Sequence, residues 1–85
     1  MVSVTLLDDE EDIREEFAAY LQGLGHVVQT VGSIKQFSSL FLTHKPDIAV
    51  VDRSLPDGDG LDLVRELRQQ GVRCGVIMFT AKDAT

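Results

Sequence analysis

Acidic side chains stand at the ends of two apolar segments of this sequence. Asp8 and Asp9 follow residues 2–6, where apolar and polar residues alternate, and Asp52 follows the continuously apolar residues 48–51. Aspartate is disfavoured in strands, so a purely structural role explains the Asp8-Asp9 pair poorly. Because the carboxyl ends of the strands in an open parallel sheet face one crevice, we expect these carboxylates to meet there.

Thr80 is a further polar residue at such a position, since it follows the apolar residues 76–79. Taken singly, Asp52 could cap the loop that follows it, and Thr80 could satisfy its hydroxyl locally. The helix dipole stabilises acids near a helix N-terminus by roughly 0.3 to 1 kcal/mol, which is enough to explain Glu11 and Asp12. The joint occurrence of polar residues at three strand ends favours a functional site.

A cluster of carboxylates needs a cation or raised pKa values. Two unit charges about 4 Å apart repel by about 4 kcal/mol at an effective dielectric constant near 20. Ligands that are all oxygen atoms suit Mg²⁺, which typically takes one or two carboxylates and keeps waters that exchange with phosphate oxygens. The sequence therefore predicts a Mg²⁺ site at this crevice.

The periodicity of apolar residues predicts the elements that position these side chains. Residues 2–6 are expected to form a strand, and residues 26–31 an edge strand with both faces partly wet. Between them lies an amphipathic helix that ends at Gly23 and Gly25. The apolar stripe of that helix consists of Ile13, Phe17, Tyr20, Leu21 and Leu24.

The second half of the sequence continues the alternation of helix and strand. A helix over residues 34–41 precedes a buried strand over residues 48–51. Residues 55–60 are dense in turn formers and lead into a helix marked by Leu61, Val64 and Leu67. A further buried strand, residues 76–79, follows that helix.

Strands that alternate with helices at these spacings predict βαβ units and an α/β fold with a doubly wound parallel sheet. A chain of 85 residues has room for one small core and not for two, so residues 1–85 are expected to form one domain. Four strands, three helices and a turn or the start of a fourth helix in residues 81–85 make this architecture incomplete.

Composition narrows the function further. Eight basic and fourteen acidic residues give a net charge of −6, which disfavours binding to nucleic acids and to anionic membranes. The sequence shows no export signal and no apolar run of membrane-spanning length, so we expect a cytoplasmic location. The single cysteine, Cys74, cannot form an intrachain disulfide and is interpreted as a small packing residue.

Three motifs resemble, in order and spacing, those of the receiver domains of bacterial two-component response regulators. They are the pair Asp8-Asp9, the run 52–60 (DRSLPDGDG) and the pair Thr80-Ala81. The resemblance implies a flavodoxin-like sheet of strand order 2-1-3-4-5. The fifth strand and fifth helix are absent, so the chain corresponds to the N-terminal two-thirds of a receiver domain.

The resemblance also implies a role for each site residue. Asp52 would be the phospho-acceptor, Asp9 a direct Mg²⁺ ligand and Asp8 a ligand through water. Asp52 itself and the backbone carbonyl of Ser54 would complete the protein ligands. A metal that neutralises phosphoryl oxygens and holds the donor in line suits attack by a carboxylate nucleophile.

Thr80 would hydrogen-bond the phosphoryl group, with Ala81 beside it as the second residue of the switch pair. Ser54 and Lys82 lie two positions after Asp52 and Thr80, at sites that tune water access in this family. For Lys82, a solvated loop lysine is an equally good interpretation. The family also carries a lysine at the end of its fifth strand; Lys82 is not that residue, and this chain has no counterpart.

The implied partners are a histidine kinase or phosphotransfer protein and an output domain in cis or in trans. Such a module catalyses only its own phosphorylation and dephosphorylation, and is not an enzyme otherwise. One alternative is a shortened receiver-like module without phosphotransfer, which could self-associate through the exposed edge of strand 76–79. A phosphatase with an aspartate nucleophile is a weaker alternative, because that class resembles D-x-D and Ser54 occupies its second position.

Overall fold

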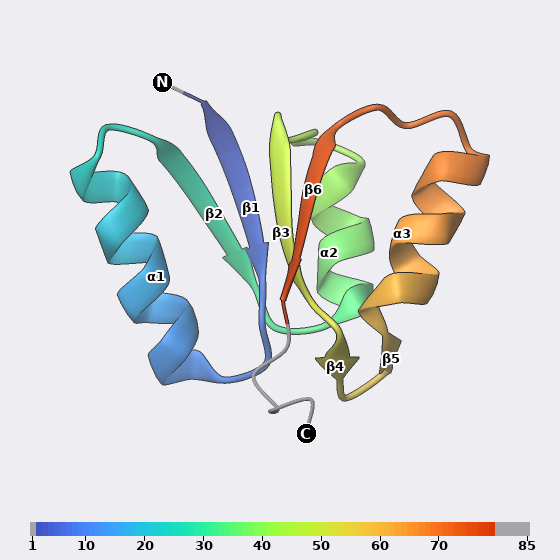
Figure 1. Cartoon of the computed structure of the whole chain (residues 1–85), viewed down its shortest axis with the longest axis horizontal. Helices are drawn as coiled ribbons and strands as arrows, with labels where there is room; N and C mark the ends of the chain where they lie inside the picture. Colours follow the sequence, from blue (N-terminus) through green and yellow to red (C-terminus); the bar gives the residue numbers. More distant parts are fainter. Residues whose placement is uncertain (1, 80–85) are drawn as a thin grey trace.

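A sheet of four parallel strands forms the centre of the molecule, in the order β2-β1-β3-β6 (Figure 1). The computed structural model describes residues 2–79, and of Phe79 only the backbone. This order confirms the predicted parallel sheet, with β6 as the expected fourth strand. The strands are β1 (Ser3–Leu7), β2 (Val27–Val31), β3 (Ile48–Asp52) and β6 (Gly75–Phe79).

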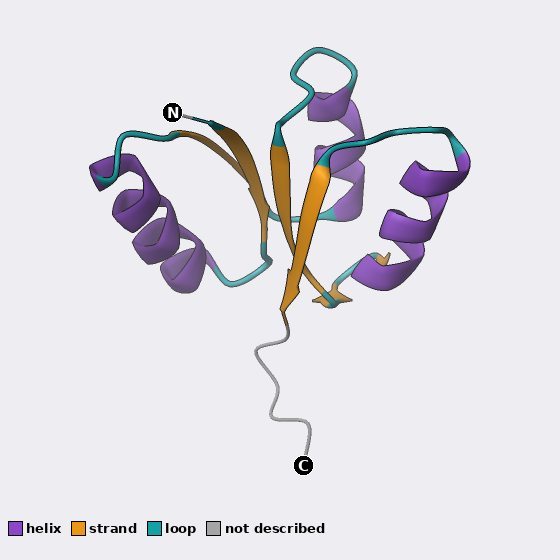
Figure 2. Cartoon of the chain, turned by 45° about the horizontal axis from the view of Figure 1, so that its top comes forward, coloured by secondary structure: helices purple, strands orange, loops and turns teal. Residues whose placement is uncertain are grey.

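Helices cover both faces of the sheet, as a doubly wound fold requires. Figures 1 and 2 show α1 on one face and both α2 and α3 on the other. Ser33 caps α2, because its hydroxyl oxygen accepts the Gln36 N–H at 3.1 Å. No helix among residues 2–79 is long and apolar enough to cross a membrane. The helices are α1 (Glu11–Gly23), α2 (Ile34–Phe41) and α3 (Gly60–Gln69).

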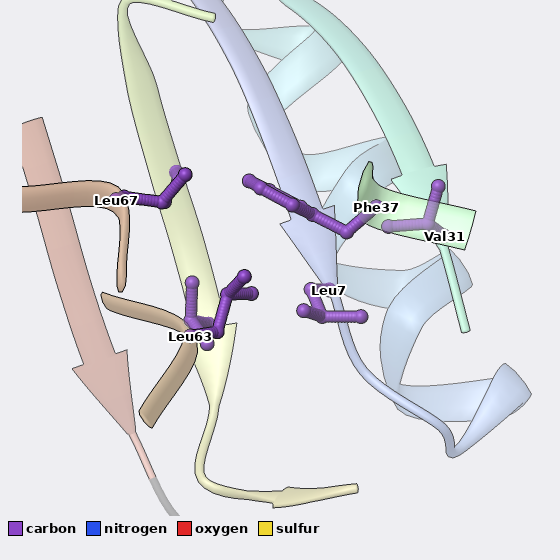
Figure 3. Packing of buried hydrophobic residues seen from close by; sticks show 7 residues of the cluster. Leu7, Val31, Phe37, Leu63 and Leu67 are labelled. Atoms are coloured by element: carbon purple, nitrogen blue, oxygen red, sulfur yellow. The ribbon is translucent and has the colours of Figure 1, made fainter. Parts of the chain in front are cut away.

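The larger core lies between the sheet and the two helices α2 and α3 (Figure 3). Phe37 is almost fully buried there and stacks on Phe41, with ring centroids 5.6 Å apart. Burying a side chain of this size contributes roughly 1.5 to 3 kcal/mol, and this core has more buried members than the one under α1. The buried members of this core are Leu7, Val31, Phe37, Ala49, Val51, Leu63 and Leu67.

The core under α1 is smaller than the sequence predicts. Phe17 and Leu21 pack with Val4, Leu6, Ala18 and Val50, but the predicted stripe residues Ile13, Tyr20 and Leu24 are exposed. α1 packs chiefly on β2 and β1, which are too narrow a surface to bury all five stripe positions. On the same face of the sheet, Ile77 of β6 is 55% exposed.

The connection from β3 to α3 is more regular than the predicted loop. It contains a short antiparallel hairpin of β4 (Ser54–Leu55) and β5 (Gly58–Asp59). Leu55 is partly buried against the larger core, so the hairpin is anchored to the domain. The hairpin places the residues that follow Asp52 in a defined position beside the carboxyl end of β3.

Candidate functional site

The predicted meeting of the carboxylates is confirmed. Asp8 directly follows β1 and Asp52 ends β3, and these two strands are parallel neighbours with Leu7 opposite Val51. Carboxylate oxygens of Asp8, Asp9 and Asp52 lie within 4.8 Å of one another. Asp8 is fully buried and Asp52 is only 2% exposed, whereas Asp9 is exposed.

Asp8 is held through its backbone and through one side-chain oxygen. Its N–H donates to the Val31 carbonyl at 3.1 Å, and its carbonyl accepts from Nη1 of Arg14 at 2.9 Å. Oδ1 accepts the Glu10 N–H at 2.9 Å, but the buried Oδ2 has no hydrogen-bond partner among the described residues. A buried carboxylate oxygen without a partner is costly, so Oδ2 is suited to face a cation or one of the waters that a cation holds.

Asp52 is held by the first residues of the connection that follows it. Its Oδ1 accepts the Ser54 N–H at 3.1 Å, and the Gly60 N–H donates to the Arg53 carbonyl at 2.8 Å. A Cβ at position 60 would collide with the Asp52 carbonyl oxygen and would lie 2.8 Å from Cγ1 of Val51. Only glycine therefore allows α3 to begin this close to the backbone of Asp52.

The pKa of Asp52 is shifted by its buried place in the cluster. Burial raises the pKa of its carboxyl above the ordinary value, and the charges of Asp8 and Asp9 raise it further. The hydrogen bond from the Ser54 backbone acts in the opposite direction and lowers the pKa. The net rise shows that the fold holds this carboxylate in a place that disfavours its charge.

The three carboxylates suit a Mg²⁺ ion. Mg–O bonds are about 2.0 to 2.1 Å long, so two ligands on opposite sides of the ion lie about 4.2 Å apart. The oxygens of Asp9 and Asp52, which lie within 4.8 Å of each other, need only a small adjustment to reach this spacing, and Asp8 is close enough to act through a water on the ion. The donors are all oxygen atoms, as a hard divalent cation requires, and the unpartnered oxygen of Asp8 gains a partner.

The other predicted site residues are less completely described. Ser54 opens β4 next to Asp52 with an exposed side chain, and its carbonyl remains a predicted ligand. Thr80, Ala81 and Lys82 lie outside the described residues, so their roles remain predictions.

Two residues near the site have contacts that the sequence did not reveal. Arg14 reaches from α1 to the Asp8 carbonyl, and a Cβ at Gly32 would lie 2.7 Å from its Nη1. Asp57 was interpreted as turn chemistry, yet its carboxylate binds backbone N–H groups at the start of α2. The Asp57 contact joins segments more than twenty residues apart, so no spacing of residue types reveals it. The Arg14 contact spans only six residues, but it ends on a backbone carbonyl, which leaves no mark on the residue pattern.

Comparison with known proteins decides the family. A family model of the response regulator receiver domain matches residues 4–85. The chain belongs to the receiver domain family. The virulence transcriptional regulatory protein PhoP of Salmonella typhimurium is 35% identical over 83 residues, which cover 98% of this chain and 37% of PhoP. This receiver chain thus spans about a third of the length of such relatives.

Solved structures support the same assignment. The receiver domain of a Francisella response regulator superposes with a TM-score of 0.91 at 27% identity, covering 100% of this chain and 70% of that one. The response regulator TrrA from Thermotoga maritima, solved in complex with Mg²⁺ and a beryllium fluoride, gives a TM-score of 0.89 at 26% identity, with 98% of this chain and 72% of TrrA covered. The receiver assignment and the flavodoxin-like fold are therefore confirmed.

Proposed function

We propose that this receiver domain accepts a phosphoryl group on Asp52, from the phosphohistidine of a partner kinase or phosphotransfer protein, or from a small acyl phosphate. The observation that carries the proposal is the carboxylate cluster, in which Asp8 and Asp52 are buried and Oδ2 of Asp8 has no partner among the described residues. Burying several like charges together lowers stability, so a binding role explains the cluster better than a structural one.

The chain's own residues supply an oriented nucleophile. The Ser54 N–H fixes Oδ1 of Asp52, which leaves the other carboxylate oxygen to attack phosphorus. As the new O–P bond forms, the bond from phosphorus to the donor breaks, and the donor's imidazole or carboxylate leaves with the electron pair. The product is an aspartyl phosphate, and the domain acts only on itself.

Asp8, Asp9, Asp52 and the Ser54 carbonyl would hold Mg²⁺, with Asp8 acting through water. When bound, the ion neutralises charge on the phosphoryl oxygens and aligns the donor. Without a cation, the carboxylates would repel an anionic donor. The neighbour TrrA was solved with Mg²⁺ and a beryllium fluoride, which supports this ligand class.

The residues after β6 are proposed to respond to phosphorylation of Asp52. Thr80 would bind the phosphoryl group, with Ala81 beside it. The side chains of Ser54 and Lys82 would set how readily water reaches the aspartyl phosphate. Thr80→Ala should leave Mg²⁺ affinity unchanged and alter the lifetime of the adduct, which acid-quenched labelling measures.

The remaining partners are proposed from the family. PhoP is a transcriptional regulatory protein, and we propose that this domain likewise controls an output domain, in cis or in trans. The net charge of −6 argues against direct nucleic-acid or membrane contact by this segment. Cys74 is a free thiol, which suits the reducing cytoplasm as the proposed compartment.

Labelling with acetyl phosphate tests the proposal against its alternatives. We expect one phosphoryl group per chain, dependent on Mg²⁺ and abolished in Asp52→Asn but retained in the matched surface variant Asp62→Asn. An adduct that persists in Asp52→Asn would refute the acceptor assignment. Turnover of phosphate esters would indicate a phosphatase, and no adduct would indicate an interaction module.

The edge of β6 is also proposed as a surface for self-association of the 85-residue chain. β6 pairs only with β3 among the described residues, and Ile77 of β6 is 55% exposed. Exposed apolar edge strands tend to pair with another chain. Light scattering during size-exclusion chromatography should show dimers or larger species that Ile77→Lys reduces; a monomer at all concentrations would contradict this.

A further inference from the structure

The tip of the β4–β5 hairpin is fastened to the start of α2 by one side chain. The carboxylate of Asp57 accepts the backbone N–H of Ile34 at 2.9 Å through Oδ1 and that of Lys35 at 3.0 Å through Oδ2. Both carboxylate oxygens are used, so the contact fixes the direction of the side chain as well as its distance. It joins the connection after Asp52 to a helix that comes earlier in the chain.

The next residue brings the hairpin against the same helix. Gly58 has φ of +155°, and a Cβ at this position would lie 2.8 Å from Cδ1 of Ile34. The tip therefore packs directly on the Ile34 side chain, which would have to move to admit a Cβ at position 58. The two hydrogen bonds of Asp57 are made within this close contact.

The base of the same hairpin is fastened to the acceptor. Ser54 opens β4, pairs with Asp59, and donates its N–H to Oδ1 of Asp52. The Gly60 N–H closes the base through the Arg53 carbonyl. A short hairpin held at both ends transmits a shift of its tip to its base, so the position of Ser54 depends on the anchor at Asp57.

Helix capping alone does not account for Asp57. Ser33 already caps α2 from within its own segment, through the Gln36 N–H. The bonds from Ile34 and Lys35 to Asp57 lie at the exposed surface, where water can satisfy the same N–H groups. What water cannot replace is the link between the hairpin and the helix.

We propose that Asp57 is a positioning residue for the acceptor site: by binding the first two amides of α2, it holds the hairpin so that Ser54 keeps its N–H on Asp52 and its carbonyl in place for the metal. The inference rests on the proposed function, because it assigns Asp57 a role in Mg²⁺ binding and phosphorylation. It predicts that Mg²⁺ affinity depends on a side chain that is not itself a ligand.

Mg²⁺ titration of the whole chain by calorimetry tests this, with Asp57→Ala and Asp57→Asn beside Asp62→Ala as the matched exposed control. Losing hydrogen bonds of this kind should weaken Mg²⁺ binding on the order of threefold to tenfold in Asp57→Ala. Asp57→Asn keeps one acceptor oxygen, so its affinity should lie between Asp57→Ala and wild type. Asp62→Ala should bind Mg²⁺ as the wild type does.

Amide hydrogen exchange without metal gives a second measurement. Asp57→Ala should speed exchange at Ile34 and Lys35, and also at Gly60 in the hairpin base. Faster exchange at the two helix amides alone, with unchanged Mg²⁺ affinity, would show a purely structural cap and overturn the inference. If Asp57→Ala does not fold, the same comparison is decided by Asp57→Asn.

The two proposals fail in different ways. If the wild-type chain binds Mg²⁺ and takes up the phosphoryl group but Asp57 variants match it, only the positioning role is refuted. If the wild-type chain does neither, the proposed function is refuted, and the positioning role is refuted with it.

Discussion

Replacing Asp52 with asparagine should stabilise the metal-free chain even though it removes the proposed acceptor. Asparagine has nearly the same shape and retains an oxygen that can accept the Ser54 N–H. What it removes is one negative charge from a cluster in which Asp8 is also buried. The change therefore isolates the electrostatic cost of the site.

The size of the effect follows from the spacing of the carboxylates. At the 4.8 Å limit of the cluster, the pair Asp8 and Asp52 repel by about 3.5 kcal/mol at an effective dielectric constant of about 20. The loss of folding stability caused by ionised Asp52 cannot exceed about 4 kcal/mol at pH 7, because at a higher cost the folded chain would bind a proton there instead. This limit corresponds to the roughly 3 pH units between pH 7 and the pKa of Asp52 in the unfolded chain. Allowing for solvent near the exposed Asp9, we expect a gain of roughly 1 to 3 kcal/mol.

The gain should also depend on pH in a defined direction. The folded-state pKa of Asp52 is raised, so protonation favours the folded state, and the wild-type chain loses stability as the pH rises through that folded value. The advantage of Asp52→Asn should therefore be largest near neutral pH. It should disappear as the pH falls below the ordinary value of 3.8.

Thermal unfolding in EDTA measures this, with Asp62→Asn as the surface control. For a domain of this size, each kcal/mol raises Tm by roughly 4 to 8 °C. Saturating Mg²⁺ should then stabilise the wild type and narrow the difference, because ligand binding to the folded state adds RT ln(1 + [L]/Kd). A metal-free Asp52→Asn chain that is no more stable than wild type would refute the electrostatic reasoning.

Three further predictions follow from the site. Asp9→Ala should weaken Mg²⁺ binding at least about tenfold in a calorimetric titration, and unchanged affinity would show that Asp9 is not a ligand. Gly60→Ala should lower the free energy of unfolding in urea by about 1 to 3 kcal/mol and impair labelling of Asp52, because the new Cβ would collide with the Asp52 backbone. The control Gly23→Ala has open space around its Cβ and should not lower the free energy of unfolding. The hydrogen bonds from the Ile34 and Lys35 amides lower the pKa of Asp57 in the folded chain. The ionised side chain therefore contributes to folding stability above pH 3.8, and this contribution is lost as the pH falls through the lower folded pKa. Asp57→Asn should flatten stability in that acid range, and an unchanged pH profile would contradict the assignment.

Periodicity predicted most of the elements because it reports burial directly. The apolar residues 48–51 became a central strand, and the acids that follow two strands met because parallel neighbours end at the same edge. Periodicity does not reveal which strands are neighbours; that order came from the family resemblance. The exposure of Tyr20 and Leu24 was missed for a related reason, because a stripe shows which face of a helix is apolar and not how much sheet is present to cover it.

The contacts made by loops were the other part that could not be predicted. Gly60 stood among turn formers, yet its helical position requires glycine because the Asp52 carbonyl is so close. Asp57 caps a helix earlier in the chain, and Asp59 caps α3 by accepting the Leu61 N–H at 2.9 Å. Asp57 looked like an ordinary turn residue, because a carboxylate that binds a distant amide carries no local pattern. Asp59 binds an amide only two residues ahead, and among neighbouring turn formers this local cap was not distinguished from turn chemistry.

The pairing of β1 with β3 also determines when, during folding, the proposed metal site can form. Asp8 and Asp52 belong to segments far apart in the sequence, and only the closed β1–β3 ladder brings them together. Because closing so long a loop costs entropy, we expect this pairing to form late in folding. Mg²⁺ should therefore leave the refolding rate nearly unchanged and slow unfolding, since an interaction absent from the transition state acts on the unfolding rate.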